Sequence, residues 1–278
     1  MKNTEINFVG ARKGATGTLA DLQDSPPAPK AWVNPAIMTA VINRLISEQH
    51  THSRLDLHAL IQNHFFDADN NRYRFVWSKN MITSAGVSKI KTKSGKEEMV
   101  LHFRDGEEER KSKPRWMRKI LEGLHAKGGR AGDSVEDFIY LTLVHEANEI
   151  HIREEAEVDT LVPDVKAEVH AEIEEAKAYF ALSAERKKVL LQLYKMLDET
   201  DDPRKAVYSG EIEVFESIGE EKLGTIAGLL KLISYVLEMP DYVKEANLYN
   251  DDRTRQQLAR SLFVDVLHDF SGASPVDN

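Results

Sequence analysis

The fold class is decided by residues 73–104, which read "YRFVWSKNMITSAGVSKIKTKSGKEEMVLHFR". Apolar and polar side chains alternate over much of this stretch, as expected of strands with one buried face. Ser94 and Gly95 supply a turn between two of the alternating runs. The runs are residues 73–78, 85–95 and 96–104. We therefore predict a small antiparallel sheet here, in a chain whose other periodic segments are helical.

Helical periodicity surrounds these strands on both sides. Asn34 can cap a helix that has Pro35 at its first position, and residues 54–66 are predicted to form a second helix before the sheet. After the sheet, Asp133 or Ser134 can cap a long helix. The helices predicted there are residues 115–129, 135–155, 165–197, 221–239 and 253–270. The pattern indicates an α+β fold, with a small antiparallel sheet packed on helices and a mostly helical C-terminal half.

The composition divides the chain into three parts. Residues 1–30 are rich in Gly, Ala and Pro and show no sustained period, which is typical of a flexible leader. Residues 31–160 hold the sheet with its helices and carry a basic insertion at about residues 104–132. Pro163 marks a break in the helical pattern, and residues 161–278 form an acidic helical region.

Composition also excludes several classes of protein. With 278 residues, of which 41% are apolar, the chain can bury a substantial core. The most apolar stretch, residues 224–239, is short and interrupted by Lys231, so we predict no membrane-spanning segment. Since the chain has no cysteine, disulfides, thiolate metal sites and cysteine nucleophiles are excluded. Because the N-terminus lacks the apolar core of a secretory signal, we expect a cytoplasmic protein.

The net charge of −9 conceals an asymmetry along the chain. Residues 71–130 contain 16 of the 37 Lys/Arg but only 7 of the 46 Asp/Glu, so they are basic and the rest of the chain is strongly acidic. A basic segment can contact nucleic acid, whereas acidic surfaces favour a protein partner with a basic surface. We expect such a protein partner and no membrane, and leave open both contact with nucleic acid and assembly into a homo-oligomer.

The residues that carry chemistry lie in "HEANE", residues 145–149. Positions four apart share one face of a helix, so His145 and Glu149 can bind one cation. Any zinc here would need His and carboxylate ligands, and Glu146 is placed beside them as a base for a water molecule. His151 lies about 240° around the helix from His145, too far to share the site. The candidates for a third ligand are Glu154, Glu157, Glu168 and His170.

A merely charged helix is the alternative interpretation of the same residues. In a chain with 30% charged residues, "HEANEIHIREEAEVD" is also typical of a solvated acidic face beneath an apolar stripe that includes Leu143 and Ile150. The Glu-rich pattern around His170 invites comparison with carboxylate-bridged di-iron bundles. Those bundles need paired Glu-x-x-His elements on two helices, which this sequence lacks.

The order of landmarks along about residues 55–151 resembles the SprT-like metallopeptidase domain. The landmarks are a helix, the strand containing Trp77 and Ser78, then Ala85-Gly86, a hairpin, and an apolar helix that carries His145-Glu146. The family motif is HExxH, so Glu149 gives a degenerate HExxE in place of the second histidine. The resemblance implies a zinc peptidase in which His145 and Glu149 bind zinc and Glu146 activates water. It also implies that the strand after Gly86 is an edge that pairs with substrate.

The insertion at about residues 104–132 has two interpretations. Its basic side chains and one tryptophan are suited to hold phosphates and stack on a base, and SprT-like proteins often act near DNA. The same residues are also what the solvated face of an amphipathic helix presents, with Trp116 packed inward. The candidate nucleic-acid-binding residues are Lys111, Lys113, Arg115, Trp116, Arg118 and Lys119.

Two functions of different classes follow. The first is a SprT-like metallopeptidase, or a catalytically degenerate relative that acts through protein binding. The second is a non-enzymatic acidic protein, similar to inhibitors encoded by phages, that occupies a basic, nucleic-acid-binding surface of a partner protein. The missing second histidine favours the binding protein, whereas Glu146 with Glu149 at ligand spacing favours the enzyme.

Overall fold

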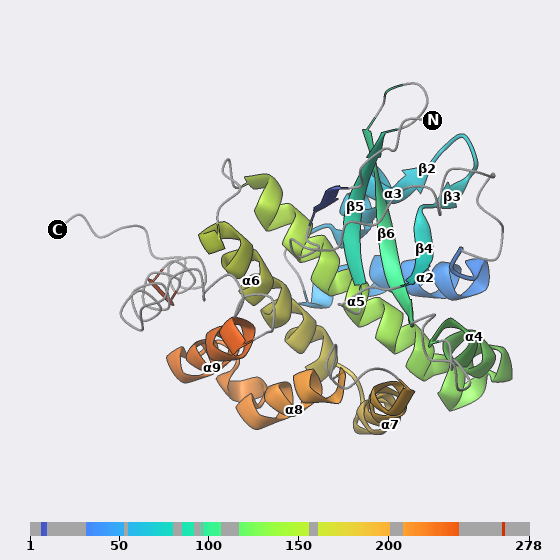
Figure 1. The fold of residues 1–278 in the computed structure, drawn as a ribbon. Helices are drawn as coiled ribbons and strands as arrows, with labels where there is room; N and C mark the ends of the chain where they lie inside the picture. The colour runs from blue at the N-terminus through green and yellow to red at the C-terminus, as the bar shows by residue number, and fades with distance from the viewer. Residues whose placement is uncertain are drawn as a thin grey trace.

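The computed structural model confirms the predicted α+β fold (Figure 1). All the regular elements that it describes after residue 116 are helical, which confirms the mostly helical C-terminal half. The structure describes residues 7–9, 32–52, 55–79, 85–91, 95, 97–106, 117–155, 161–200, 208–238 and 263–264. Within these residues, no helix has the length and apolarity needed to cross a membrane.

The main sheet is mixed rather than wholly antiparallel. Its strands are β1 (Asn7–Val9), β4 (Phe75–Lys79), β5 (Ala85–Lys91) and β6 (Glu97–Gly106), in the order β1-β5-β6-β4. Strand β6 lies between β5 and β4. It runs antiparallel to β5 but parallel to β4, where Phe75 lies opposite Leu101. A separate ribbon pairs β2 (Phe66–Asp67) with β3 (Arg72–Tyr73).

The strand after Gly86 is not an edge of this sheet. In β5, Val87 lies opposite Val9 of β1 on one side and opposite Leu101 of β6 on the other. Since β5 has a neighbour on both sides, the expectation that it is an edge for substrate is wrong. Strand β1 comes from within residues 1–30, and the other residues of that predicted leader lie outside the described part of the chain.

Two helices precede strands β2 to β6, as predicted. They are α2 (Pro35–His52) and α3 (Leu57–Phe65). Asn34 and Asp56 cap them, each through a side-chain oxygen that accepts a backbone N–H at 2.9 Å. Phe65 of α3 packs on Phe75 of β4, with ring centroids 5.6 Å apart, so that helix and sheet share one apolar core.

Helix α5 (Gly129–Glu155) carries the HEANE motif through the middle of the molecule. It follows α4 (Met117–Lys127) at Gly128 and begins at Gly129. These two glycines have φ of 66° and 57°, a left-handed backbone that glycine adopts without steric cost. This turn starts α5 ahead of Asp133, so the prediction that Asp133 or Ser134 caps the helix is wrong. Helix α5 contacts β5 as well as α2, α3 and α4 (Figure 1).

The helices of the C-terminal half are α6 (Leu161–Phe180), α7 (Ala184–Thr200), α8 (Tyr208–Ile218), the short η1 (Glu220–Lys222) and α9 (Ile226–Glu238). The single helix predicted at residues 165–197 is two, because Ser183 caps α7 by accepting the N–H of Arg186 at 3.3 Å. Pro163 lies in the first turn of α6, where its missing N–H costs no helical hydrogen bond. Helix α8 was not predicted, and nearly all of residues 253–270 lie outside the described residues.

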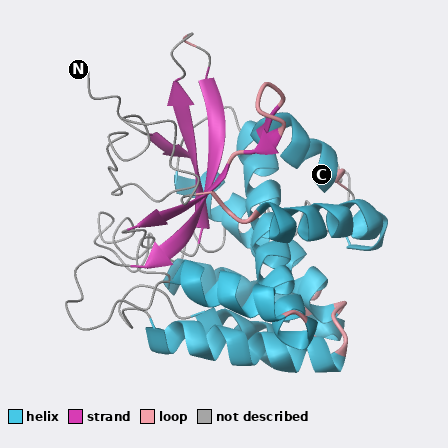
Figure 2. Cartoon of the chain, turned by 90° about the vertical axis from the view of Figure 1, so that its right-hand side faces the viewer, coloured by secondary structure: helices cyan, strands magenta, loops and turns pink. Residues whose placement is uncertain are grey.

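A buried carboxylate connects three of these helices. Asp137 of α5 is fully buried and accepts hydrogen bonds from Arg44 of α2 and from Arg186 of α7, the latter at 3.0 Å. The guanidinium of Arg44 also lies over the ring of Tyr140, 3.9 Å from its centroid. Two cations therefore compensate one buried charge and hold α2 and α7 against α5, in the helical layer that Figure 2 shows mostly to one side of the sheet.

Candidate metal centre

The centre lies between α5 and α6, which pack against each other more extensively than any other pair of elements (Figure 1). Helix α5 supplies His145, Glu146 and Glu149. Helix α6 supplies Glu168, Glu172 and Glu175, whose spacing of four and three residues places them on one face of that helix. The two helices thus direct one imidazole and several carboxylates into the space between them.

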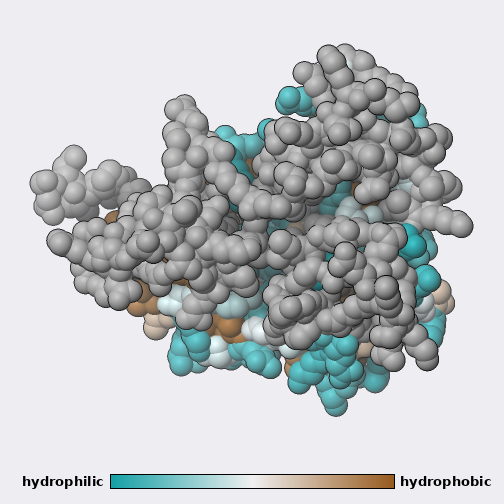
Figure 3. Space-filling model, viewed as in Figure 1, coloured by the Kyte–Doolittle hydropathy of each residue, from teal (hydrophilic) through white to brown (hydrophobic). Residues whose placement is uncertain are grey.

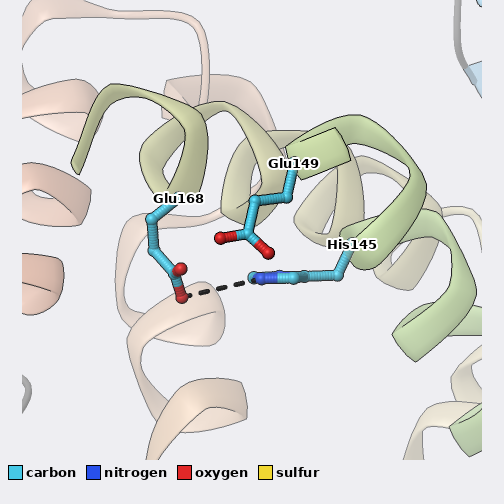
Figure 4. A group of neighbouring side chains, drawn as sticks. All are labelled: His145, Glu149 and Glu168. Carbon is cyan, nitrogen blue, oxygen red and sulfur yellow. Dashed lines mark ion pairs between the residues drawn. The ribbon is translucent and has the colours of Figure 1, made fainter. Parts of the chain in front are cut away.

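His145 lies between two carboxylates of α6. Its Nδ1 is 3.0 Å from Glu175 Oε2, and its Nε2 is 3.6 Å from Glu168 Oε1. The potential ligand atoms of His145, Glu149 and Glu168 all lie within 4.8 Å of one another. Figure 4 shows these three side chains pointing toward a common point, with His145 and Glu149 on one helix and Glu168 on the other.

A second group of donors lies around the same imidazole. The potential ligand atoms of His145, Glu172 and Glu175 also lie within 4.8 Å of one another. Glu211 of α8 is hydrogen-bonded to Glu175, and its pKa is raised by burial and then by the charges of Glu175 and Glu172. The centre therefore contains six carboxylates from three helices, and His145 is common to both groups.

The centre is almost completely shielded from solvent. Each of the five carboxylate residues of α5 and α6 is only 2–6% exposed. Arg153 offsets part of their charge, because its Nη2 lies 2.5 Å from Glu149 Oε1. Arg153 and His145 are the cations that lower the pKa values of Glu146 and Glu149. The six carboxylates thus form a largely buried, strongly acidic cluster.

The pKa values of the centre reflect this excess of negative charge. Burial and the charge of Glu149 together raise the pKa of Glu146 to about 8. Burial also raises the pKa values of Glu149 and Glu211. For His145, burial alone would lower the pKa, but hydrogen bonds to Glu168 and Glu175 hold it well above its usual range. Without a metal, protons must balance part of the charge.

One oxygen of Glu146 has no hydrogen-bond partner within the described structure. Glu146 is 6% exposed, and this oxygen, Oε2, is buried. An unpaired carboxylate in such a place is costly unless a proton or a cation compensates it. This atom is the strongest single sign that the centre binds something further.

The structure brings the sequence-predicted residues His145 and Glu149 together and adds Glu168 from the four third-ligand candidates. Of the others, Glu154 pairs with His64 at 3.3 Å, and Glu157 lies outside the described residues. His151 and His170 belong to neither group of potential ligands. The interpretation of HEANE as a solvated face is wrong, because both of its glutamates are buried.

Sequence reasoning missed Glu172, Glu175 and Glu211. The carboxylates of α6 carry a signal in their helical spacing, but a di-iron bundle needs paired Glu-x-x-His elements on two helices, and the sequence lacks such a pair. Glu211 carried none, because it reaches the centre only through the packing of α8.

The basic insertion can be followed only in part. Lys111, Lys113, Arg115 and Trp116 lie outside the described residues. On α4, Lys119 is exposed, and the guanidinium of Arg118 is 3.9 Å from Asp105. The role of this segment in binding nucleic acid stays a prediction.

The donor set fits a divalent cation. Imidazole and carboxylate ligands suit zinc, and the high proportion of carboxylates also suits manganese and magnesium. A ligating imidazole commonly donates its other N–H to a carboxylate, which is the arrangement of His145 with Glu175. Comparisons of the chain with protein-family models, curated proteins and solved structures find no match.

Proposed function

We propose that this protein is a metal-dependent hydrolase whose centre lies between α5 and α6. The observation that carries the proposal is the convergence of His145, Glu149 and Glu168 beside the buried, unpartnered oxygen of Glu146. This set combines three ligands with one base, which is the minimum for hydrolysis at a single cation.

Each residue has a distinct role in this proposal. His145, Glu149 and Glu168 would hold the cation, and Glu175 would orient the imidazole through Nδ1. When bound, the cation would polarise the substrate and acidify a water molecule. Glu146 directly follows the ligand His145 on α5, and it would take a proton from the attacking water and pass it to the leaving group.

Peptides are the substrate class that we propose, and the cytoplasm is the proposed location. The order of landmarks from the Trp77 strand to the HEANE helix supports a peptidase, since it resembles the SprT-like domain. The departure at Glu149 does not remove a ligand, because a carboxylate can replace an imidazole at zinc.

Calorimetric titration of zinc into the chelator-treated full chain tests the binding step. Wild type should bind zinc, and His145→Ala should bind it at least tenfold more weakly because one ligand is lost. His151→Ala is the matched control, since it removes a histidine of the same helix that belongs to neither ligand group. Equal zinc affinity in all three proteins would remove His145 from the site.

Hydrolysis of unfolded casein by the zinc-loaded chain tests the catalytic step. Glu146→Gln should bind zinc as wild type does but lose at least about 100-fold in rate, because Gln cannot accept a proton. Zinc binding without hydrolysis in wild type would contradict the peptidase proposal and leave only the proposal of a metal-binding protein.

The runner-up is an acidic protein that binds a basic partner. It is favoured by the exposed carboxylates of α8 and η1, in the lower, largely hydrophilic region of Figure 3. These residues are Glu213, Glu216, Glu220 and Glu221. Binding of a Lys-rich peptide to this surface should weaken steeply with added salt, because exposed charges are screened over about 10 Å at 0.1 M. Binding that salt leaves unchanged would argue for apolar docking instead.

A further inference from the structure

We propose that the centre holds two divalent cations rather than one. The first position is formed by His145, Glu149 and Glu168, and the second by Glu172, Glu175 and Glu211. This inference rests on the proposed function, because it extends the same centre by a second cation.

The two nitrogens of one imidazole separate the two positions. Nε2 of His145 points to Glu168, at 3.6 Å, whereas Nδ1 lies 3.0 Å from Glu175. A cation held at Nε2 leaves Nδ1–H free to donate to Glu175, which remains able to bind a second cation through its other lone pairs. The two donor groups can therefore be filled together.

The second position has three carboxylates from two helices. Glu172 and Glu175 are three residues apart on α6, within the 4.8 Å that joins their potential ligand atoms. Glu211 reaches them from α8 through its hydrogen bond to Glu175. Its Oε1 is buried and has no hydrogen-bond partner among the described residues. Such oxygen-only sets suit manganese and magnesium more than zinc.

The charge of the centre independently favours a second cation. One divalent cation beside Glu149 and Glu168 would not contact the carboxylates on the other side of His145. These are Glu172, Glu175 and Glu211. Glu146 adds a carboxylate that is more than nine-tenths buried and has no hydrogen-bond partner in the described structure. A second divalent cation would offset more of the charge of these buried carboxylates than a single cation can.

Two cations would also change the chemistry of the centre. Paired cations can stabilise the attacking and the leaving oxygen of one displacement together. His145 would then couple the positions, because it binds one cation directly and contacts a ligand of the other.

Native mass spectrometry of the chelator-treated full chain, reloaded with manganese, tests the proposal. Wild type should carry two manganese ions per chain. Glu172→Gln and Glu211→Gln should each carry one, because each loses a ligand of the second position only. Glu174→Gln is the matched control, since Glu174 lies on the same helix but pairs with Lys177 at 2.6 Å, and it should still carry two.

One manganese ion in wild type, unchanged in Glu172→Gln and Glu211→Gln, would overturn the second position and leave the proposed single site intact. No bound metal in wild type would overturn both proposals. Because the wild-type count decides by itself, a variant that fails to fold does not prevent a decision.

Discussion

At the residue scale, the sequence predicted what is local and missed what depends on packing. His145 and Glu149 could be paired from the sequence because four residues along a helix always return to the same face. Their burial could not be predicted from the sequence, because it requires α6 to cover α5. Glu175 and Glu211 lie 30 and 66 residues from His145 and become its neighbours only in the folded chain.

The protonation of Glu146 gives a prediction for stability. At pH 8 without metal, the carboxylate is partly charged in a buried site, beside the charges of Glu149 and Glu168. Glu146→Gln removes that charge and should raise the melting temperature much more at pH 8 than at pH 5, where Glu146 is still neutral in the folded chain. Thermal unfolding at both values measures this, with Glu174→Gln as the control. Equal shifts at the two pH values would show that Glu146 does not titrate as described.

At the element scale, Asp137 tests how α2 and α7 are held on α5. Asp137→Ala should destabilise the protein by about 3–5 kcal/mol, because it removes the buried carboxylate that pairs with both Arg44 and Arg186. Glu185→Ala breaks the exposed pair with Arg130 and should cost less than about 1 kcal/mol. Urea unfolding gives both free energies. Similar losses would mean that the buried carboxylate does not organise these helices.

A second prediction at this scale concerns the close contact between Gly228 of α9 and Lys222 of η1. A Cβ on Gly228 would collide with the carbonyl oxygen of Lys222, so Gly228→Ala should destabilise the protein. Gly123→Ala on α4 meets nothing within 4 Å and should stabilise by about 0.5–1 kcal/mol through helix propensity. Urea unfolding should show a lower free energy of unfolding for Gly228→Ala and a higher one for Gly123→Ala. A Gly228→Ala variant as stable as wild type would contradict the packing of α9.

The elements themselves were predicted where their signals are local. Capping by Asn34 and the strands up to Arg104 followed from short-range patterns. The parallel pairing of β4 with β6 did not follow from such patterns, because strand order depends on contacts between residues far apart in the chain. The start of α5 was missed because two glycines began it earlier than the expected cap.

At the scale of the whole molecule, the centre makes stability depend on pH. Glu146, Glu149, Glu211 and His145 all have raised pKa values, so the folded chain binds more protons than the unfolded chain. Their contribution is complete below the unfolded pKa values and is lost as pH rises, for Glu146 between about 4.5 and about 8. The metal-free protein should therefore lose stability as pH rises.

The pH range of that measurement matters because of one other residue. Burial lowers the pKa of His102 to about 4, so its contribution to stability increases up to its ordinary value of 6.5. Melting temperatures should accordingly be compared above pH 6.5, where the contribution of His102 no longer changes with pH. Manganese or zinc should reduce the fall by replacing protons as the compensating charge. A rise in melting temperature with pH in the metal-free protein would contradict the raised pKa values.

The metal content of the untagged full chain, purified without chelator, tests the central claim most directly. Elemental analysis should find at least one divalent cation per chain in wild type, with a melting temperature that falls when a chelator removes it. In the His145→Ala variant the content should drop, while His151→Ala should match wild type. A metal-free wild type whose stability neither chelator nor added zinc or manganese changes would contradict the account.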